Sequence, residues 1–208
     1  MQRRKRGHEE GWLLSYADLI TNLLLFFVVL LSAANLSKGK MEQIAKAISG
    51  EEQPESLSSI QAEIEKKIIE QKLEGIVQSK LKDEGLELSL NSGFVFDSGH
   101  AIIRRDFEAA LDSMLLVLKP YSEKYNFAIE GHTDATPVLP SSQFPSNWEL
   151  SAARAIVVRA RLEGIGIDRA RIRVEGYADT KPLPATELAA LPPGERDARL
   201  RRVVVRIY

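Results

Sequence analysis

The hydrophobic residues of the chain fall into segments that follow different periods. The first segment is a nearly unbroken apolar run, WLLSYADLITNLLLFFVVLLSAA, from Trp12 to Ala34. As a helix with a rise of about 1.5 Å per residue, the run is about 34 Å long, which is enough to cross a hydrocarbon core of about 30 Å. The pattern therefore predicts one membrane-spanning helix over residues 12–34, preceded by a short basic tail over residues 1–11.

The charges around this run predict its orientation. The sequence Arg-Arg-Lys-Arg at residues 3–6 places the tail in the cytoplasm and everything after Ala34 on the other side of the membrane. A cleaved signal peptide is the competing interpretation, because residues 19–31 resemble an h-region and Ser32-Ala33-Ala34 resembles a cleavage site. The apolar stretch is long and begins before Asp18, which favours an uncleaved signal anchor.

Asp18 is the one ionisable residue inside the predicted span. A carboxylate there costs about 2.5–3.5 kcal/mol on insertion scales, so its default interpretation is functional. At 100° per residue, Ser15, Asp18 and Asn22 share one face, with Thr21 beside them. We interpret Asp18 as an ion-carrying residue and the other three as channel-facing. The alternative, that Asp18 reaches from the interface to water, is disfavoured because its side chain is short.

A single helix with one polar stripe cannot enclose an ion path. We therefore expect at least a homodimer, together with a separate multi-span partner. A carboxyl group that alternates between protonated and ionised forms is a proton relay, so H⁺ is the expected coupling ion, with Na⁺ as the alternative.

Two helical patterns follow the span. Met41, Ile44, Ala45 and Ile48 have helical spacing, and Gly50 and the segment 51–59 end that helix. A second apolar stripe with helical spacing runs from Ile60 to Lys82. The pattern has too few heptads for a coiled coil, so residues 35–85 are expected to form a helical linker.

From Leu86 onward, strand and helix periods alternate. Strands are predicted at residues 86–90, 127–131, 172–176 and 203–207. Helices are predicted from Arg104 to Leu118, and from an N-cap at Ser151 to Gly164. The order predicts a compact α/β sandwich over residues 86–208.

Composition excludes several function classes. The 28 basic and 29 acidic residues leave a net charge of -1, which gives no reason to expect nucleic acid as a partner. The absence of cysteine excludes disulfides, thiolate zinc sites and cysteine nucleophiles. The sequence also has no catalytic-triad pattern, glycine-rich phosphate loop or metal-ligand spacing. We therefore expect a non-enzyme that needs no metal or other cofactor.

Motifs at both ends of the chain resemble one family. GHTD at residues 131–134 and SNWELSAARA at residues 146–155 resemble the peptidoglycan-binding domain of the OmpA/MotB family. Three further segments of that domain follow in order, Gly164-Ile165-Gly166, Val174-Glu175-Gly176-Tyr177 and Arg201-Arg202-Val203. The pattern from Trp12 through Tyr16-Ala17-Asp18-Leu19 to Thr21 resembles the transmembrane helix of the flagellar stator subunit MotB.

The resemblance implies the B subunit of an ion-driven stator in the bacterial inner membrane, with its C-terminal domain in the periplasm. Two copies would be surrounded by a ring of the multi-span A subunit, which ion flow turns around the anchored B dimer. Asp18 matches the ion-carrying carboxylate. The helix with Met41, Ile44 and Ile48 matches the plug that blocks leakage before activation.

The same resemblance implies a wall-binding site. A diaminopimelate side chain ends in an ammonium and a carboxylate, so its site needs an anion and a fork-shaped cation, which Asp134 and Arg154 supply. The other wall-binding candidates are Asn147, Thr133 and Arg202. A plain salt bridge from Asp134 to Arg154 is the structural alternative. Leu200 stands where the family usually has Asn before Arg-Arg-Val, which puts one contact at the edge of this site in doubt.

Three functions fit these features. The first is a stator B subunit of the MotA/MotB type whose work turns a rotor. The second uses the same motor chemistry for another output, as in anti-phage defence systems of the Zorya type. The third is a passive tether between membrane and wall, against which Asp18 and its polar face argue.

Overall fold

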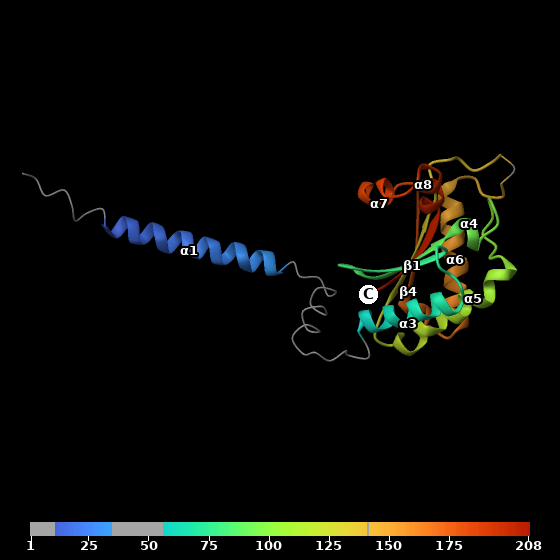
Figure 1. Ribbon diagram of the computed structural model, residues 1–208, viewed down its shortest axis with the longest axis horizontal. Coiled ribbons are helices and arrows are strands. Elements are labelled where there is room, and N and C mark those ends of the chain that lie inside the picture. The colour runs from blue at the N-terminus through green and yellow to red at the C-terminus, as the bar shows by residue number, and fades with distance from the viewer. Residues whose placement is uncertain (1–10, 35–55, 141) are drawn as a thin grey trace, which may run out of the picture.

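The computed structural model describes residues 11–34, 56–140 and 142–208 (Figure 1). Helix α1 spans Gly11–Ala34, as the sequence predicts. Its segment Trp12–Leu30 has a mean hydropathy of 2.1 and no buried side chains, and it is the one helix in the described ranges long and apolar enough to cross a membrane. The basic tail up to residue 10 and the predicted helix around Met41 lie outside the described residues.

The C-terminal domain is built on a five-stranded sheet (Figure 1). The strands, in spatial order, are β1 Val77–Lys82, β2 Gly85–Asn91, β5 Arg202–Ile207, β3 Phe127–His132 and β4 Ile172–Ala178. β3 and β4 are parallel because a helix crosses over between them, and every other neighbouring pair is antiparallel. β1 and β4 are the two edge strands.

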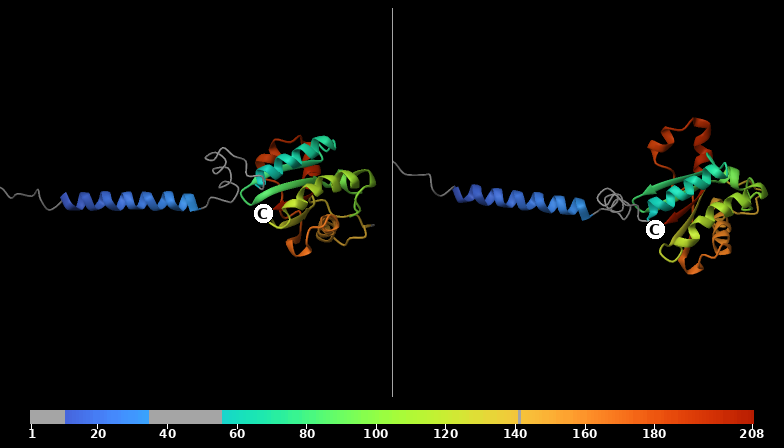
Figure 2. Two further views of the ribbon diagram at one scale, coloured as in Figure 1. Left: turned by 90° about the horizontal axis from the view of Figure 1, so that it is seen from below. Right: turned by 60° about the horizontal axis from the view of Figure 1, so that its bottom comes forward.

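Helices cover one face of the sheet, which we call the inner face (Figure 2). The helices of the domain are α3 Leu57–Glu70, α4 Ser92–Val95, α5 Arg105–Leu115, α6 Asn147–Gly164, α7 Ala185–Ala189 and α8 Pro193–Leu200, with 3-10 turns at Leu116–Tyr121 and Arg169–Arg171. Of these, α3, α5 and α6 bury apolar side chains against the inner face. α7 lies over the other face, where Glu187 pairs with Lys80. Charged residues occupy the opposite, outer face.

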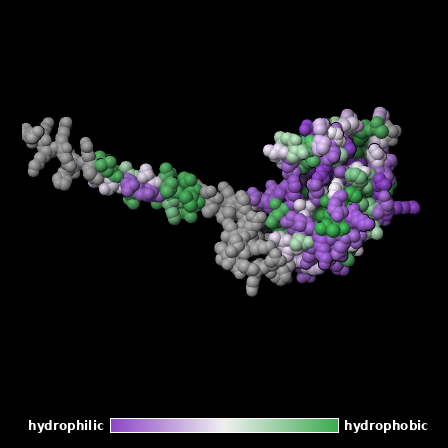
Figure 3. Space-filling view, viewed as in Figure 1, coloured by the Kyte–Doolittle hydropathy of each residue, from purple (hydrophilic) through white to green (hydrophobic). Residues whose placement is uncertain are grey.

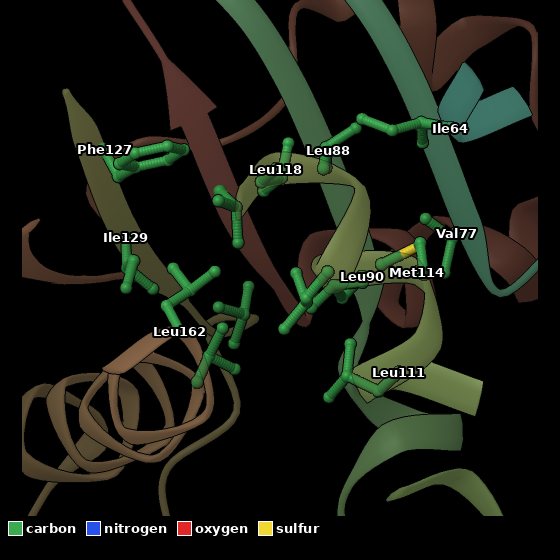
Figure 4. Close-up of a cluster of buried hydrophobic side chains, with 14 of the residues drawn as sticks. Ile64, Val77, Leu88, Leu90, Leu111, Met114, Leu118, Phe127, Ile129 and Leu162 are labelled. Atoms are coloured by element: carbon green, nitrogen blue, oxygen red, sulfur yellow. The ribbon is translucent and has the colours of Figure 1, made fainter. Parts of the chain in front are cut away.

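Strand alternation produces the core. Leu88, Leu90, Phe127 and Ile129 point to the inner face and are fully buried, and Figure 4 shows them with Leu111, Met114, Leu118 and Leu162 from the helical layer. Between them lie residues such as Glu87, Glu130 and Arg206, which face outward. The predicted α/β sandwich behind a single apolar helix is therefore confirmed.

The predicted helix from Ile60 to Lys82 is wrong in its second half. α3 ends at Glu70, and Lys72 and Gly75 turn the chain with φ of 56° and 80°. Residues 77–82 then form β1, which pairs with β2. A short apolar run fits the helical period of 3.6 residues and the strand period of two residues about equally well. Here the segment is a strand because it pairs with β2. α3 and β1, which we assigned to a linker, belong to the packed domain, and this domain begins before residue 86.

Three other predicted boundaries shift. α6 is capped by Ser146, whose side chain accepts from the Trp148 N–H, and Ser151 lies inside the helix. The helix predicted through Leu118 ends at Leu115 and continues as a 3-10 turn that contains Pro120. The Pro/Ala-rich stretch after Pro182 contains the short helices α7 and α8.

Candidate functional site

The end of β3 is held tightly against α6. A Cβ added to Gly131 would lie 2.0 Å from the backbone oxygen of Ser151, so only glycine permits this approach. The Ser151 hydroxyl donates to the Trp148 carbonyl at 2.9 Å and accepts from the Ala178 N–H at 3.2 Å. These contacts fix the segment after β3 relative to α6, where the candidate site lies.

We expect Gly131→Ala to destabilise the domain by about 1–3 kcal/mol or more, because its neighbour is backbone that cannot rotate away. Thermal unfolding of the purified chain measures the effect. Gly194→Ala is the matched control, since a Cβ there meets nothing within 4 Å. Equal melting temperatures for the two variants would show that the contact between β3 and α6 is loose.

A cleft of about 590 Å³ opens where β3 ends. Its walls come from the segment after β3, from α4 with the loop that follows it, from the first turns of α6 and from the residue before β5. Four of the five predicted wall-binding residues line it, namely Thr133, Asp134, Asn147 and Arg154. Sequence positions up to about a hundred residues apart thus meet in one cavity.

Asp134 supplies the negative charge of the cleft. Its Oδ1 accepts from the Thr136 N–H at 3.0 Å, and its Oδ2 is 2.5 Å from Nη1 of Arg201. Asn147 donates to the Thr136 carbonyl at 2.8 Å and to the Asp134 carbonyl at 3.3 Å. The role of Asn147 in this structure is therefore to hold the loop that presents Asp134.

Arg154 is buried at the floor of the cleft, with 5% of its surface exposed. Its Nε donates to the His100 carbonyl at 3.0 Å, its Nη2 lies 3.4 Å from the Asp97 carbonyl, and its guanidinium stands 5.2 Å from the centre of the Phe96 ring. Burial, with the nearby charge of Arg201, lowers the pKa of Arg154 to about 10, so the side chain stays charged at neutral pH.

The two charges of the cleft do not neutralise each other directly. Among the described residues, Asp134 forms its ion pair with Arg201 and not with Arg154. The structure therefore does not contain the plain Asp134–Arg154 salt bridge that was the alternative. Within the described ranges, Arg154 Nη1 makes no hydrogen bond to the protein. A guanidinium nitrogen in this state can donate to a carboxylate.

Two buried hydroxyls also point to a ligand. The Oγ1 of Thr133 and the Oγ of Ser92 are buried in residues that line the cleft, and neither has a hydrogen-bond partner in the described part of the chain. Buried polar atoms are rarely left unpaired in folded proteins. A polar ligand or water in the cleft would satisfy both.

Arg202, the fifth predicted wall-binding residue, is not in the cleft. Val203 points to the core, so alternation along β5 sends Arg202 to the outer face, where it donates to the carbonyls of Leu200 and Lys181. Arg201, which precedes the strand, lines the cleft instead. The structure therefore places Arg201, and not the predicted Arg202, at the cleft. The side chain of Leu200 is not part of the cleft wall.

His132 also faces away from the cleft. It stacks on Tyr177 with ring centroids 5.5 Å apart, and its Nε2 is 3.4 Å from Glu130 Oε2. Burial lowers the pKa of His132 although the carboxylate of Glu130 lies close by, so the ring is neutral at neutral pH. Its contacts anchor the strand ends and do not touch the cleft.

The polar residues of α1 gather around Asp18. The Asn22 amide lies 3.4 Å from Asp18 Oδ1, and the Thr21 hydroxyl donates to the Asp18 carbonyl at 2.9 Å. Ser15 lies about one turn earlier. Figure 3 shows a polar patch that interrupts the apolar surface of this helix in its first half. The predicted plug residues Met41, Ile44 and Ile48 lie outside the described residues.

Comparisons with known proteins match both ends of the chain. Residues 1–51 match the family model described as membrane MotB of the proton-channel complex MotA/MotB, and residues 95–190 match the OmpA family. Motility protein B of Bacillus subtilis is 29% identical, and the alignment covers 99% of this chain and 95% of that protein. Motility protein B of Helicobacter pylori is 25% identical over 84% of this chain and 78% of its own length.

Solved structures agree on the fold of the C-terminal domain. A MotB-like protein from Desulfovibrio vulgaris has a TM-score of 0.63 at 23% identity, with 73% of this chain and 92% of that chain covered. The cell wall anchor of the type VI secretion system from Pseudomonas aeruginosa has a TM-score of 0.59 at 26% identity, with coverage of 70% and 96%. The chain therefore resembles MotB over residues 1–51 and the OmpA family over residues 95–190.

Proposed function

We propose that this chain is the wall-anchored B subunit of a membrane-embedded, ion-driven motor of the MotA/MotB type. One observation carries the proposal. A lone carboxylate in an apolar span and a charged cleft in a folded domain occur in the same chain. The first feature suits ion transfer, and the second suits attachment to a fixed polymer. A motor needs both, because force on a rotor requires an anchored stator.

Asp18 is the ion-carrying group in this proposal, and Ser15, Thr21 and Asn22 face the ion path. The contacts from Asn22 and Thr21 keep polar atoms beside the carboxylate within an otherwise apolar helix. H⁺ is the proposed coupling ion, because a single carboxyl can take up and release a proton without a cage of oxygen ligands. Na⁺ is the alternative and would need further oxygen ligands from a partner.

The single polar stripe implies partners inside the membrane. Two copies of α1 within a ring of a multi-span A subunit would enclose the stripe and exclude lipid from it. The basic tail places the N-terminus in the cytoplasm, and the sheet domain then lies in the periplasm of a cell whose inner membrane holds the complex. In this arrangement the segment with Met41, Ile44 and Ile48 is the proposed plug.

The cleft is the proposed peptidoglycan site. The ammonium of a diaminopimelate side chain would replace Arg201 at Asp134, and the adjacent carboxylate would accept from Arg154. Thr133 and Ser92 offer hydroxyls to the same ligand. Arg201, once displaced, remains beside the cleft as a second cation. Binding needs no cofactor and no bond is broken, which fits an anchor and not an enzyme.

The proposal predicts a stable complex with a multi-span membrane protein. The tagged full chain, extracted from native membranes in mild detergent, is expected to co-purify with an A-type subunit. A chain from which residues 1–34 are deleted serves as the control and should lose that partner. Isolation of the full chain without a multi-span partner would favour a passive tether, the function suggested by the wall anchor from Pseudomonas aeruginosa.

The identity of the co-purified partner also decides the output of the motor. An A subunit that contacts a flagellar rotor makes this chain a flagellar stator. An A subunit made together with nucleases or other defence proteins makes it part of a Zorya-type system. The chemistry proposed for Asp18 and for the cleft is the same in both.

A further inference from the structure

Arg201 occupies the place in the cleft that the ammonium of the proposed ligand would take. Its Nη1 lies 2.5 Å from Oδ2 of Asp134, whose side chain is 9% exposed. Among the described residues, this carboxylate is the one hydrogen-bond partner of the Arg201 guanidinium. The empty cleft therefore holds a cation of its own, and a ligand ammonium can pair with Asp134 only by displacing that cation.

The side chain of Arg201 can leave Asp134 while its backbone stays in place. The Arg201 N–H donates to the Asp197 carbonyl at 3.1 Å, and the Arg201 carbonyl accepts from the Ser92 N–H at 2.9 Å. These two bonds hold the backbone between α8 and α4. The side chain is 40% exposed, so a change of rotamer can carry the guanidinium away from Asp134 toward solvent. Displacement by a ligand needs no rearrangement of the sheet.

The charges of the cleft disfavour a ligand that brings an ammonium alone. Two arginines, Arg154 and Arg201, line the cleft together with the single carboxylate of Asp134. After burial, the charge of Arg201 is the next cause that lowers the pKa of Arg154, so the two guanidinium groups already repel each other. An ammonium paired with Asp134 would leave Arg201 without its counter-charge and would add a third cation to the cleft.

A ligand that carries an ammonium and a carboxylate on the same carbon removes this imbalance. While the ammonium pairs with Asp134, the carboxylate lies beside the position that Arg201 has left and faces Arg154. Both arginines then have an anion close to them, so the ion pair that is broken is replaced by new ones. A binding site can gain specificity in this way, because the wrong ligand leaves a charge of the protein unpaired.

We infer that Arg201 is a specificity-determining residue of the cleft. It competes with the ligand ammonium for Asp134, so the cleft favours walls in which the diaminopimelate carboxyl is free and disfavours walls in which that carboxyl is amidated or absent. This inference rests on the proposed wall site and deepens it. It assigns the discrimination between chemical types of wall to one side chain that the ligand has to displace.

Two stem peptides that differ in one group test the inference. Both end in diaminopimelate, and the side-chain carboxyl is free in one peptide and amidated in the other, so the ammonium is the same in both. Titration calorimetry with the purified full chain should show that the native protein prefers the free-carboxyl peptide by roughly 100-fold, the combined effect of two charge-assisted contacts.

Arg201→Gln removes the internal competitor and should lower this preference to roughly tenfold, the part that Arg154 supplies. The change should come from the amidated peptide, which should bind roughly tenfold more tightly to the variant than to the native chain. The free-carboxyl peptide loses one of its two cations and should not bind more tightly. Arg201→Lys keeps a cation beside Asp134 and should restore most of the preference.

Arg199→Gln is the matched control in α8. Arg199 lines a groove on the outer face of the sheet and is not part of the cleft, so this variant should bind both peptides as the native chain does. Melting temperatures show whether each variant is folded. A folded Arg201→Gln variant that keeps the native preference, or that binds the amidated peptide no more tightly, would overturn the inference and leave the wall site standing. A native chain that bound neither peptide would contradict the proposed wall site itself, and the inference with it.

Discussion

Asp18→Asn is expected to abolish ion flow and motor output while the chain still inserts and assembles. The substitution keeps the size and hydrogen-bonding capacity of the side chain, so the contact with Asn22 and the packing of α1 can persist. A carboxamide does not take up and release a proton in the physiological range, so a relay through this position stops. The measurement is proton uptake, with membrane insertion and co-purification of the A subunit as the check on assembly.

Two further variants make this prediction specific. Asp18→Glu keeps a titrating carboxyl and should retain a measurable part of the flux. Deletion of residues 41–49, the proposed plug, should raise proton leak in cells that carry the A subunit and slow their growth. Asp18→Asn in the deleted chain should cancel that leak. Flux retained in Asp18→Asn, or a leak that ignores it, would mean that the ions take another path.

The sequence predicted those helices and strands in which the spacing of apolar residues matches the face that is buried or the membrane that surrounds them. The spanning helix is long and apolar throughout, and the strands around Leu88, Ile129 and Val205 alternate cleanly because one face is buried. The spacing of apolar residues gave the wrong secondary structure between Ile76 and Leu81, because it fits a helix and a strand equally well there. There the antiparallel pairing with β2, a non-local interaction, makes the segment a strand.

The candidate site was predicted in its charges and not in its pairing. Motif spacing placed Asp134 and Arg154 together. Ser92 comes from a distant segment without a distinctive pattern, and the segment Arg201-Arg202-Val203 does not by itself say which arginine lines the cleft. The choice of Arg202 over Arg201 shows the difficulty. Neighbouring residues of one strand point to opposite faces, so an error of one position moves a side chain across the sheet. The alternation of Val203, Val205 and Ile207 is the signal that could have found Arg201.

Arg154→Lys is expected to weaken binding to diaminopimelate-type peptidoglycan by about 10- to 100-fold. Lysine keeps the positive charge but cannot donate to the His100 carbonyl and to a ligand carboxylate with the same planar fork. Charge-assisted hydrogen bonds contribute about 1.5–3 kcal/mol, and about 1.4 kcal/mol corresponds to a tenfold change in affinity. Pulldown of the purified full chain with isolated cell walls, over a range of wall concentrations, measures the loss.

The matched control lies on the same helix. Arg161→Gln removes a guanidinium about two turns further along α6, where it pairs with Glu108 and Asp112 outside the cleft. This variant should bind cell walls as the native chain does. The melting temperature of each variant separates loss of a contact from loss of the fold. Undiminished binding by a folded Arg154→Lys variant would make Arg154 a structural residue.

Asp134→Asn should lose a different part of the recognition. The amide keeps an acceptor for the Thr136 N–H, so the loop can hold its shape, but the ligand ammonium loses its counter-charge. Arg154 and Arg201 then remain in the cleft without an anion, and together they still attract a carboxylate. We therefore expect this variant to bind diaminopimelate-type walls more weakly, by about tenfold, and to be more sensitive to salt. Lysine-type walls, whose side chain ends in an ammonium alone, should lose all measurable binding to Asp134→Asn. Equal losses for both wall types would mean that Asp134 holds the loop and does not contact the ammonium.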